Sequence, residues 1–163
     1  MYQRILVPID GSDTSSLGLA EAMRLARLTG GRLRLLNVID ELSFALTMDA
    51  YTGHSGDWLN TLRENGSQLL DEAKGIVQAA GIEADTVLHD RFNLKLADSV
   101  RAEALQWPAD LIVLGTHGRR GVGRLVLGSG AESVLRSAPV PVLLVRMPEA
   151  VVASEPASLR RAP

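Results

Sequence analysis

Residues 110–130 read DLIVLGTHGRRGVGRLVLGSG, an apolar run followed by a glycine-rich segment. The run at 111–114 is apolar at every position, as is typical of a parallel strand covered by helices on both faces. The glycines that follow let backbone N–H groups approach an anion without a Cβ in the way. This stretch therefore predicts an α/β sheet that carries an anion-binding loop at the carboxyl end of one strand.

Similar apolar runs alternate with amphipathic stretches along the rest of the chain. Strands are predicted at 5–9, 33–39, 82–89, 110–114 and 140–145. Helices are predicted at 14–28, 57–80, 94–106 and 128–137, and residues 41–56 as a long loop of open role. With right-handed crossovers, this alternation predicts a five-stranded parallel sheet in the order 3-2-1-4-5, with helices on both faces.

The apolar spacing also predicts which helical side chains face the core. In the first helix these are Leu19, Met23 and Ala26; in the second Leu59, Leu62, Leu69, Ala73 and Ile76; in the third Leu94, Ala97, Val100 and Leu105. Asp57 is a candidate cap for the second helix, and Gly66 is a weak point at which that helix could kink or break. Pro141 cannot donate to a ladder, so the last strand should start there or lie at an edge.

Length and composition limit the function classes. The chain has 163 residues, no cysteine and a formal net charge of −2. One domain at 1–147 is expected, with a disordered tail at 148–163 rich in Ala, Pro and Ser. The absence of cysteine excludes thiol catalysis, Cys-based zinc sites and disulfides. The charge argues against nucleic-acid and membrane-surface binding, and no apolar run reaches the ~20 residues of a membrane span, so a cytoplasmic location is expected.

The predicted strand order places a ligand crevice between strands 1 and 4. In parallel sheets, ligands bind at the carboxyl ends of the strands where the strand order reverses. The two ends that meet there are Asp10-Gly11-Ser12 and Gly115-Thr116-His117-Gly118, which are polar and rich in glycine. Sequence pattern and topology thus predict the same site.

The residues around this crevice suit a phosphate. Gly128-Ser129-Gly130 opens the last helix, whose unpaired N–H groups favour an anion, and Ser129 adds a hydroxyl donor. Arg119, Arg120 and Arg124 either offset phosphate charge or lie in solvent. His117 is either near a general-base position or a solvent-facing loop residue. Asp10 either contacts the ligand or caps the first helix.

These motifs resemble those of a known family. Gly115-x2-Gly118-x9-Gly128-Ser129 is similar to the nucleotide-binding signature of ATP-binding universal stress proteins. Residues 5–12, 109–115 and 134–143 resemble the opening strand, the fourth strand and the ending of that family. The resemblance covers about residues 2–147 and implies an adenine nucleotide α-hydrolase-like fold. Gly130 and Ala131 depart from it, because bulkier or polar residues are frequent there.

The resemblance also implies a ligand, ATP, bound with Mg²⁺. By it, Pro8 and Asp10 line the adenosine pocket, with Asp10 near the ribose or the phosphate-bound ion, and Val38 touches adenine. The phosphates would be held by Gly115, Gly118, Gly128 and Ser129, with Arg119 and Gly130 as further ligand residues. Like the family, the chain would pair through its fifth strand, at Val142, Leu143, Leu144 and Val145. The implied role is a dimeric, nucleotide-dependent regulator in the stress response with an unidentified protein partner.

Other nucleotide enzymes lack support in the sequence. The chain has no Gly-x4-Gly-Lys-Ser/Thr, no Gly-x-Gly-x-x-Gly after the first strand and no Gly-x-Ser-x-Gly. Two alternatives stay open beside the regulator. One is a slow ATPase or autokinase that uses the same pocket, although no residue stands out as its base. The other is a nucleotide-free dimeric scaffold.

Overall fold

The computed structural model describes residues 1–39, 58–90, 95–116 and 127–147. Its elements are β1 (Arg4–Pro8), α1 (Asp13–Thr29), β2 (Arg32–Val38), α3 (Trp58–Ala79), β3 (Ala84–His89), α4 (Leu96–Gln106), β4 (Leu111–Gly115), α5 (Ser129–Ser137) and β5 (Val142–Val145). Every predicted helix and strand is present. Asp57, the loop at 41–56, Leu94 and the tail at 148–163 lie outside the described residues.

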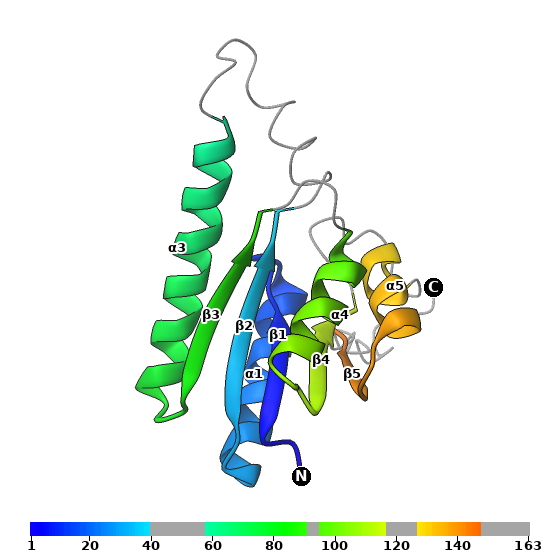
Figure 1. Cartoon of the computed structure of the whole chain (residues 1–163). Coiled ribbons are helices and arrows are strands. Elements are labelled where there is room, and N and C mark those ends of the chain that lie inside the picture. The colour runs from blue at the N-terminus through cyan, green and yellow to red at the C-terminus, as the bar shows by residue number, and fades with distance from the viewer. Residues whose placement is uncertain (40–57, 91–94, 117–126, 148–163) are drawn as a thin grey trace, which may run out of the picture.

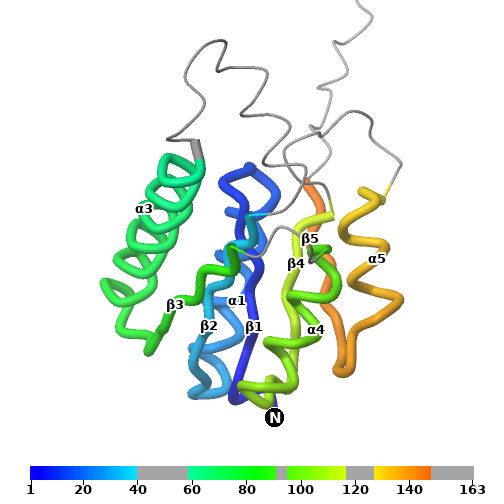
Figure 2. Tube along the Cα trace, turned by 45° about the horizontal axis from the view of Figure 1, so that its top comes forward, coloured from blue at the N-terminus to red at the C-terminus, as the bar shows by residue number. Residues whose placement is uncertain are grey.

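The five strands form one parallel sheet in the order β3-β2-β1-β4-β5, which confirms the predicted order. α1 and α3 cover one face of the sheet, and α4 and α5 cover the other (Figures 1 and 2). Among the described helices, none is both long enough and apolar enough to cross a membrane. The order reverses at β1, so the carboxyl ends of β1 and β4 lie next to each other.

Alternation along the strands fills both layers of the core. In β1, Ile5 and Val7 join the cluster under α1 and α3, whereas Leu6 joins the cluster under α4 and α5. All three side chains are fully buried. A strand buried on both faces reads as a continuous apolar run, which explains why β1 and β4 were easy to locate in the sequence.

Two of the predicted inward residues are wrong. Ile76 of α3 is 59% exposed and Leu105 of α4 is 57% exposed, while their neighbours Val77 and Ala104 are buried. Each helix packs through a narrow stripe, formed by Leu70, Ala73 and Val77 in α3 and by Ala97, Val100 and Ala104 in α4. The apolar face read from the sequence was too wide, because a surface helix can carry exposed apolar residues beside its buried stripe.

Gly66 does not break its helix, since α3 runs without interruption through it. A Cβ at Gly66 would lie 2.8 Å from Asn37 Oδ1 and 2.8 Å from Leu88 Cδ1. The glycine therefore lets α3 approach the carboxyl ends of β2 and β3 closely, which no other residue would allow without displacing these side chains.

β5 begins just after Pro141 and forms one edge of the sheet, as predicted. Its C=O groups at Pro141 and Val145 accept bonds from β4. In a parallel ladder alternate residues bond to opposite sides, so the N–H groups of Val142 and Leu144 point to the open edge. All four side chains of β5 are half-buried. The opposite edge is β3.

Candidate functional site

The carboxyl end of β4 lies against the first turn of α1. A Cβ at Gly115 would lie 2.7 Å from the C and O atoms of Thr14 and 3.0 Å from Ser15 N. These are backbone atoms that cannot rotate away, so the glycine is what permits the contact. Gly115 thus lets the end of β4 pack closely against the start of α1, while β4 itself pairs directly with β1 in the sheet.

Asp10 shapes the turn between β1 and α1. Its Oδ1 accepts hydrogen bonds from Ser12 N at 3.0 Å and from Ser12 Oγ at 2.6 Å. Gly11 between them has φ +81°, a conformation that favours glycine. The cap of α1 is Ser12, whose Oγ accepts from Ser15 N at 3.2 Å, so the alternative of Asp10 as the cap is wrong. Asp10 is half-buried, and the turn fixes the direction of its carboxylate at the crevice.

The start of α5 is tied to the end of β4. Gly128, the N-cap, donates from its backbone N to Thr116 O at 2.9 Å. Gly128 has no side chain to cap this helix, so no side-chain cap within the described residues satisfies its first N–H groups. Ser129 is exposed, and a Cβ at Gly130 would lie 3.1 Å from Leu96 Cδ2, so Gly130 lets α5 pack against α4. An anion placed here would meet open N–H groups and the positive end of the helix dipole.

Pro8 and Val38 lie on the α4 side of the sheet. Pro8 is buried at the end of β1 and pairs in register with Leu36. Val38 is half-buried at the end of β2 and packs with the core cluster under α4 and α5. Both therefore lie at the carboxyl ends of their strands, on the side of the sheet away from α1.

Sequence reasoning missed Asn37, which is 3% exposed. Its side-chain Nδ2 donates to Ile9 O at 2.8 Å, joining the end of β2 to the end of β1. A buried amide at a strand end reads as an interruption of the apolar run. The sequence signal for Asn37 is that interruption near the end of β2, which lies beside the polar end of β1.

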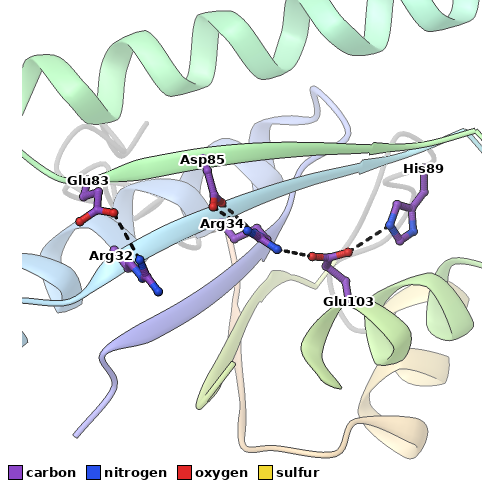
Figure 3. A network of polar contacts seen from close by, with 6 residues as sticks. All are labelled: Arg32, Arg34, Glu83, Asp85, His89 and Glu103. Carbon is purple, nitrogen blue, oxygen red and sulfur yellow. Dashed lines mark hydrogen bonds and ion pairs between the residues drawn. The ribbon is translucent and has the colours of Figure 1, made fainter. Parts of the chain in front are cut away.

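A polar network missed by sequence reasoning runs along the α4 side of β2 and β3 (Figure 3). Arg34 donates to both carboxylate oxygens of Asp85, at 2.8 and 2.6 Å, and to Glu103 Oε1 at 2.7 Å. Glu103 Oε2 lies 3.2 Å from His89 Nε2. The guanidinium of Arg34 stacks over Trp107, with Cζ 4.8 Å from the ring centroid. The hydrogen bond that Arg34 donates to Asp85 raises the pKa of Arg34. Burial lowers this pKa and the bond to Glu103 raises it further, so Arg34 stays charged.

The remaining predicted site residues lie outside the described ranges: His117, Gly118, Arg119, Arg120 and Arg124. Within those ranges, no group of three His, Asp or Glu side chains is arranged to hold a metal ion. Seven predicted residues are described, and they gather at the carboxyl ends of β1, β2 and β4 and at the start of α5: Pro8, Asp10, Val38, Gly115, Gly128, Ser129 and Gly130.

The profile of the Universal stress protein family matches residues 1–146. A universal stress protein of Methanocaldococcus jannaschii is 31% identical over 152 residues, which cover 91% of this chain and 85% of that protein. The solved universal stress protein of Archaeoglobus fulgidus in complex with dAMP is 24% identical, with a TM-score of 0.62, covering 88% of this chain and 98% of its own. A universal stress protein solved in complex with cAMP is 23% identical, with a TM-score of 0.61, covering 89% and 97%. Both solved proteins share the fold described above.

Proposed function

The chain belongs to the universal stress protein family, and on that premise we propose that it binds ATP with Mg²⁺ and acts as a nucleotide-dependent regulator. The nucleotide would lie across the carboxyl ends of β4, β1 and β2. The observation that carries this proposal is the start of α5, where Gly128 is bonded to the end of β4 and has no side chain to cap the helix.

The phosphate half of the proposal rests on backbone geometry. The N–H groups at Ser129 and Gly130 belong to the first turn of α5, and Ser129 is exposed with a hydroxyl to donate. Gly115 lets the end of β4 pack against the first turn of α1, next to Thr116, whose O accepts the bond from Gly128 N. Helix N-termini and glycine-rich strand ends bind phosphates in just such positions, and Gly118 and Arg119 would complete the loop.

The adenosine half rests on the other two strand ends. Asp10 presents an oriented carboxylate, which suits a ribose hydroxyl or a phosphate-bound Mg²⁺. Pro8 and Val38 offer apolar contacts on the α4 side, which suit the face of a purine ring. The relatives solved with dAMP and with cAMP both hold adenine nucleotides, which supports adenine as the base.

Calorimetric titration of nucleotide-stripped protein with ATP and Mg²⁺ tests the proposal. We expect saturable binding, lost in Gly118→Val because the valine side chain would block the backbone's approach to phosphate. The matched control is Gly75→Val in α3, where a Cβ meets nothing within 4 Å, and we expect it to bind as the wild type does. Equal binding by Gly118→Val and the control would refute the site, and no binding by the wild type would favour the nucleotide-free scaffold.

We also propose that the chain forms a homodimer through β5, at Val142, Leu143, Leu144 and Val145. The open edge offers the N–H groups of Val142 and Leu144 to a second strand. Val142→Pro removes one of these donors while the bonds to β4 stay in place, so we expect a folded monomer in sedimentation velocity. The circular dichroism of the variant should stay close to that of the wild type, which shows that the monomer is folded. Its thermal unfolding temperature can differ from that of the wild type, because the two samples differ in oligomeric state. A folded variant that still sediments as a dimer would contradict pairing through this edge.

A further inference from the structure

His89 stands at the outer end of the row of strand ends that forms the crevice. It is the last residue of β3 and pairs in register with Val38, and Ile39 N donates to its backbone O at 2.8 Å. Register partners in neighbouring strands present their side chains on the same face, so the imidazole lies beside Val38 on the α4 side. In Figure 3 it lies farther along β3, toward the carboxyl end, than the Arg34 and Asp85 pair.

Glu103 fixes which ring nitrogen of His89 carries the proton. The Glu103 side chain is 3% exposed, its Oε1 is held by Arg34 at 2.7 Å, and its Oε2 faces His89 Nε2 at 3.2 Å. With Glu103 ionised, its oxygens can only accept hydrogen bonds, so Nε2 would be the donor in this contact. In the neutral ring Nδ1 is then an acceptor, in a direction set by the Glu103 contact.

That acceptor has no partner among the described residues. His89 Nδ1 is buried and accepts no hydrogen bond from residues 1–39, 58–90, 95–116 or 127–147, although most buried polar atoms in proteins make one. The side chain as a whole keeps 21% exposure, so the ring is not sealed into the core. A ligand donor that entered beside Val38, with a local rearrangement around the ring, would satisfy Nδ1.

The order of the strands indicates which part of a nucleotide would arrive there. With the phosphates at β4 and α5, the ribose at β1 and the base at β2, the edge of the base farthest from the ribose faces β3. In adenine that edge carries the 6-amino group, a donor, whereas hypoxanthine and guanine carry a carbonyl oxygen, an acceptor. An imidazole nitrogen that accepts a hydrogen bond pairs with the 6-amino group of adenine and repels the 6-oxo group of hypoxanthine or guanine.

We propose that His89 Nδ1 accepts a hydrogen bond from the 6-amino group of bound adenine and thereby selects adenine over 6-oxo purines. The inference rests on the nucleotide site proposed above. The competing explanation is that His89 serves only to pair with Glu103, and two substitutions separate the roles. His89→Gln keeps a donor near the Nε2 position, toward Glu103, but has no counterpart of Nδ1. His89→Asn places an amide oxygen near the Nδ1 position but does not reach Glu103.

The experiment titrates ATP and ITP, each with Mg²⁺, into the wild type and both variants in a mildly alkaline buffer. We expect the wild type to prefer ATP by about tenfold, the value of one good hydrogen bond. In His89→Gln the affinity for ATP should fall about five- to tenfold with little change for ITP, and His89→Asn should retain most of the preference.

Three outcomes would overturn the inference. They are a wild type that binds ATP and ITP equally, a preference unchanged in His89→Gln, or a preference lost in His89→Asn as fully as in His89→Gln. The first leaves the nucleotide site standing, whereas a wild type that binds neither nucleotide refutes the proposed function itself. Nitrogen-15 NMR of the wild type gives a second readout that needs no variant. The Nδ1 resonance should shift with ATP and not with tripolyphosphate, and the absence of a shift with ATP would also overturn the assignment.

Discussion

Gly115→Ala is expected to lower both the free energy of unfolding and the affinity for ATP. The new Cβ would stand 2.7 Å from backbone atoms of Thr14, so β4 and the first turn of α1 would have to separate. Overpacking of this kind costs about 1–3 kcal/mol in free energy of unfolding. Because the Asp10 turn and the start of α5 are both attached to this region, we also expect the ATP affinity to fall at least about tenfold, as misplaced contacts typically cause.

Urea unfolding and ATP titration of the same preparation measure both effects. The control is Gly75→Ala, on the exposed side of α3 with nothing within 4 Å of the new Cβ. There alanine should leave ATP binding unchanged and stabilise the protein by up to about 1 kcal/mol through helix propensity. If Gly115→Ala matched its control in both measurements, the close approach of β4 to α1 would not be what holds the site.

Glu103→Ala should give the largest loss of stability among the charged residues. The substitution removes a carboxylate that is 3% exposed, leaving Arg34 with Asp85 alone and His89 Nε2 without its partner. Breaking a buried charge pair commonly costs about 3–5 kcal/mol. We expect about 2–4 kcal/mol here, because Arg34 keeps one partner and is itself 19% exposed.

Glu83→Ala is the matched control for that loss. Glu83 also pairs with an arginine of β2, but its side chain is 74% exposed and its contact with Arg32 is 3.4 Å long. An exposed pair of this kind contributes about 0–1 kcal/mol. Chemical unfolding of the two variants should therefore separate them clearly, and similar losses would mean that burial of Glu103 adds nothing to its pairing.

The sheet order was predictable because it depends on local signals. Apolar runs locate the strands, and the handedness of crossovers then fixes their neighbours. The same reasoning placed Asp10 and Gly115 at one site. It erred at Ile76 and Leu105, since apolar spacing does not say how much of a helix surface the sheet covers.

The His89 network could not be predicted in the same way. His89 and Glu103 are 14 residues apart, on a strand and on the helix that follows it, and their contact depends on how α4 packs over β2 and β3. Residue spacing along the sequence gives no signal for a contact between a strand histidine and a carboxylate on a packed helix. Ser12 as the cap of α1 was missed for a related reason, because Asp10 has the same capping chemistry two positions earlier.

The two open edges of the sheet differ in a way that limits assembly. β5 carries no charged residue between Val142 and Val145, whereas β3 is flanked by Glu83 and carries Asp85, whose side chain is 48% exposed. Joining another strand to β3 would strip water from these ion pairs, while joining one to β5 would not. Pairing of two copies at β5 would leave the charged β3 edges facing outward, which would disfavour growth of a closed pair into a fibre.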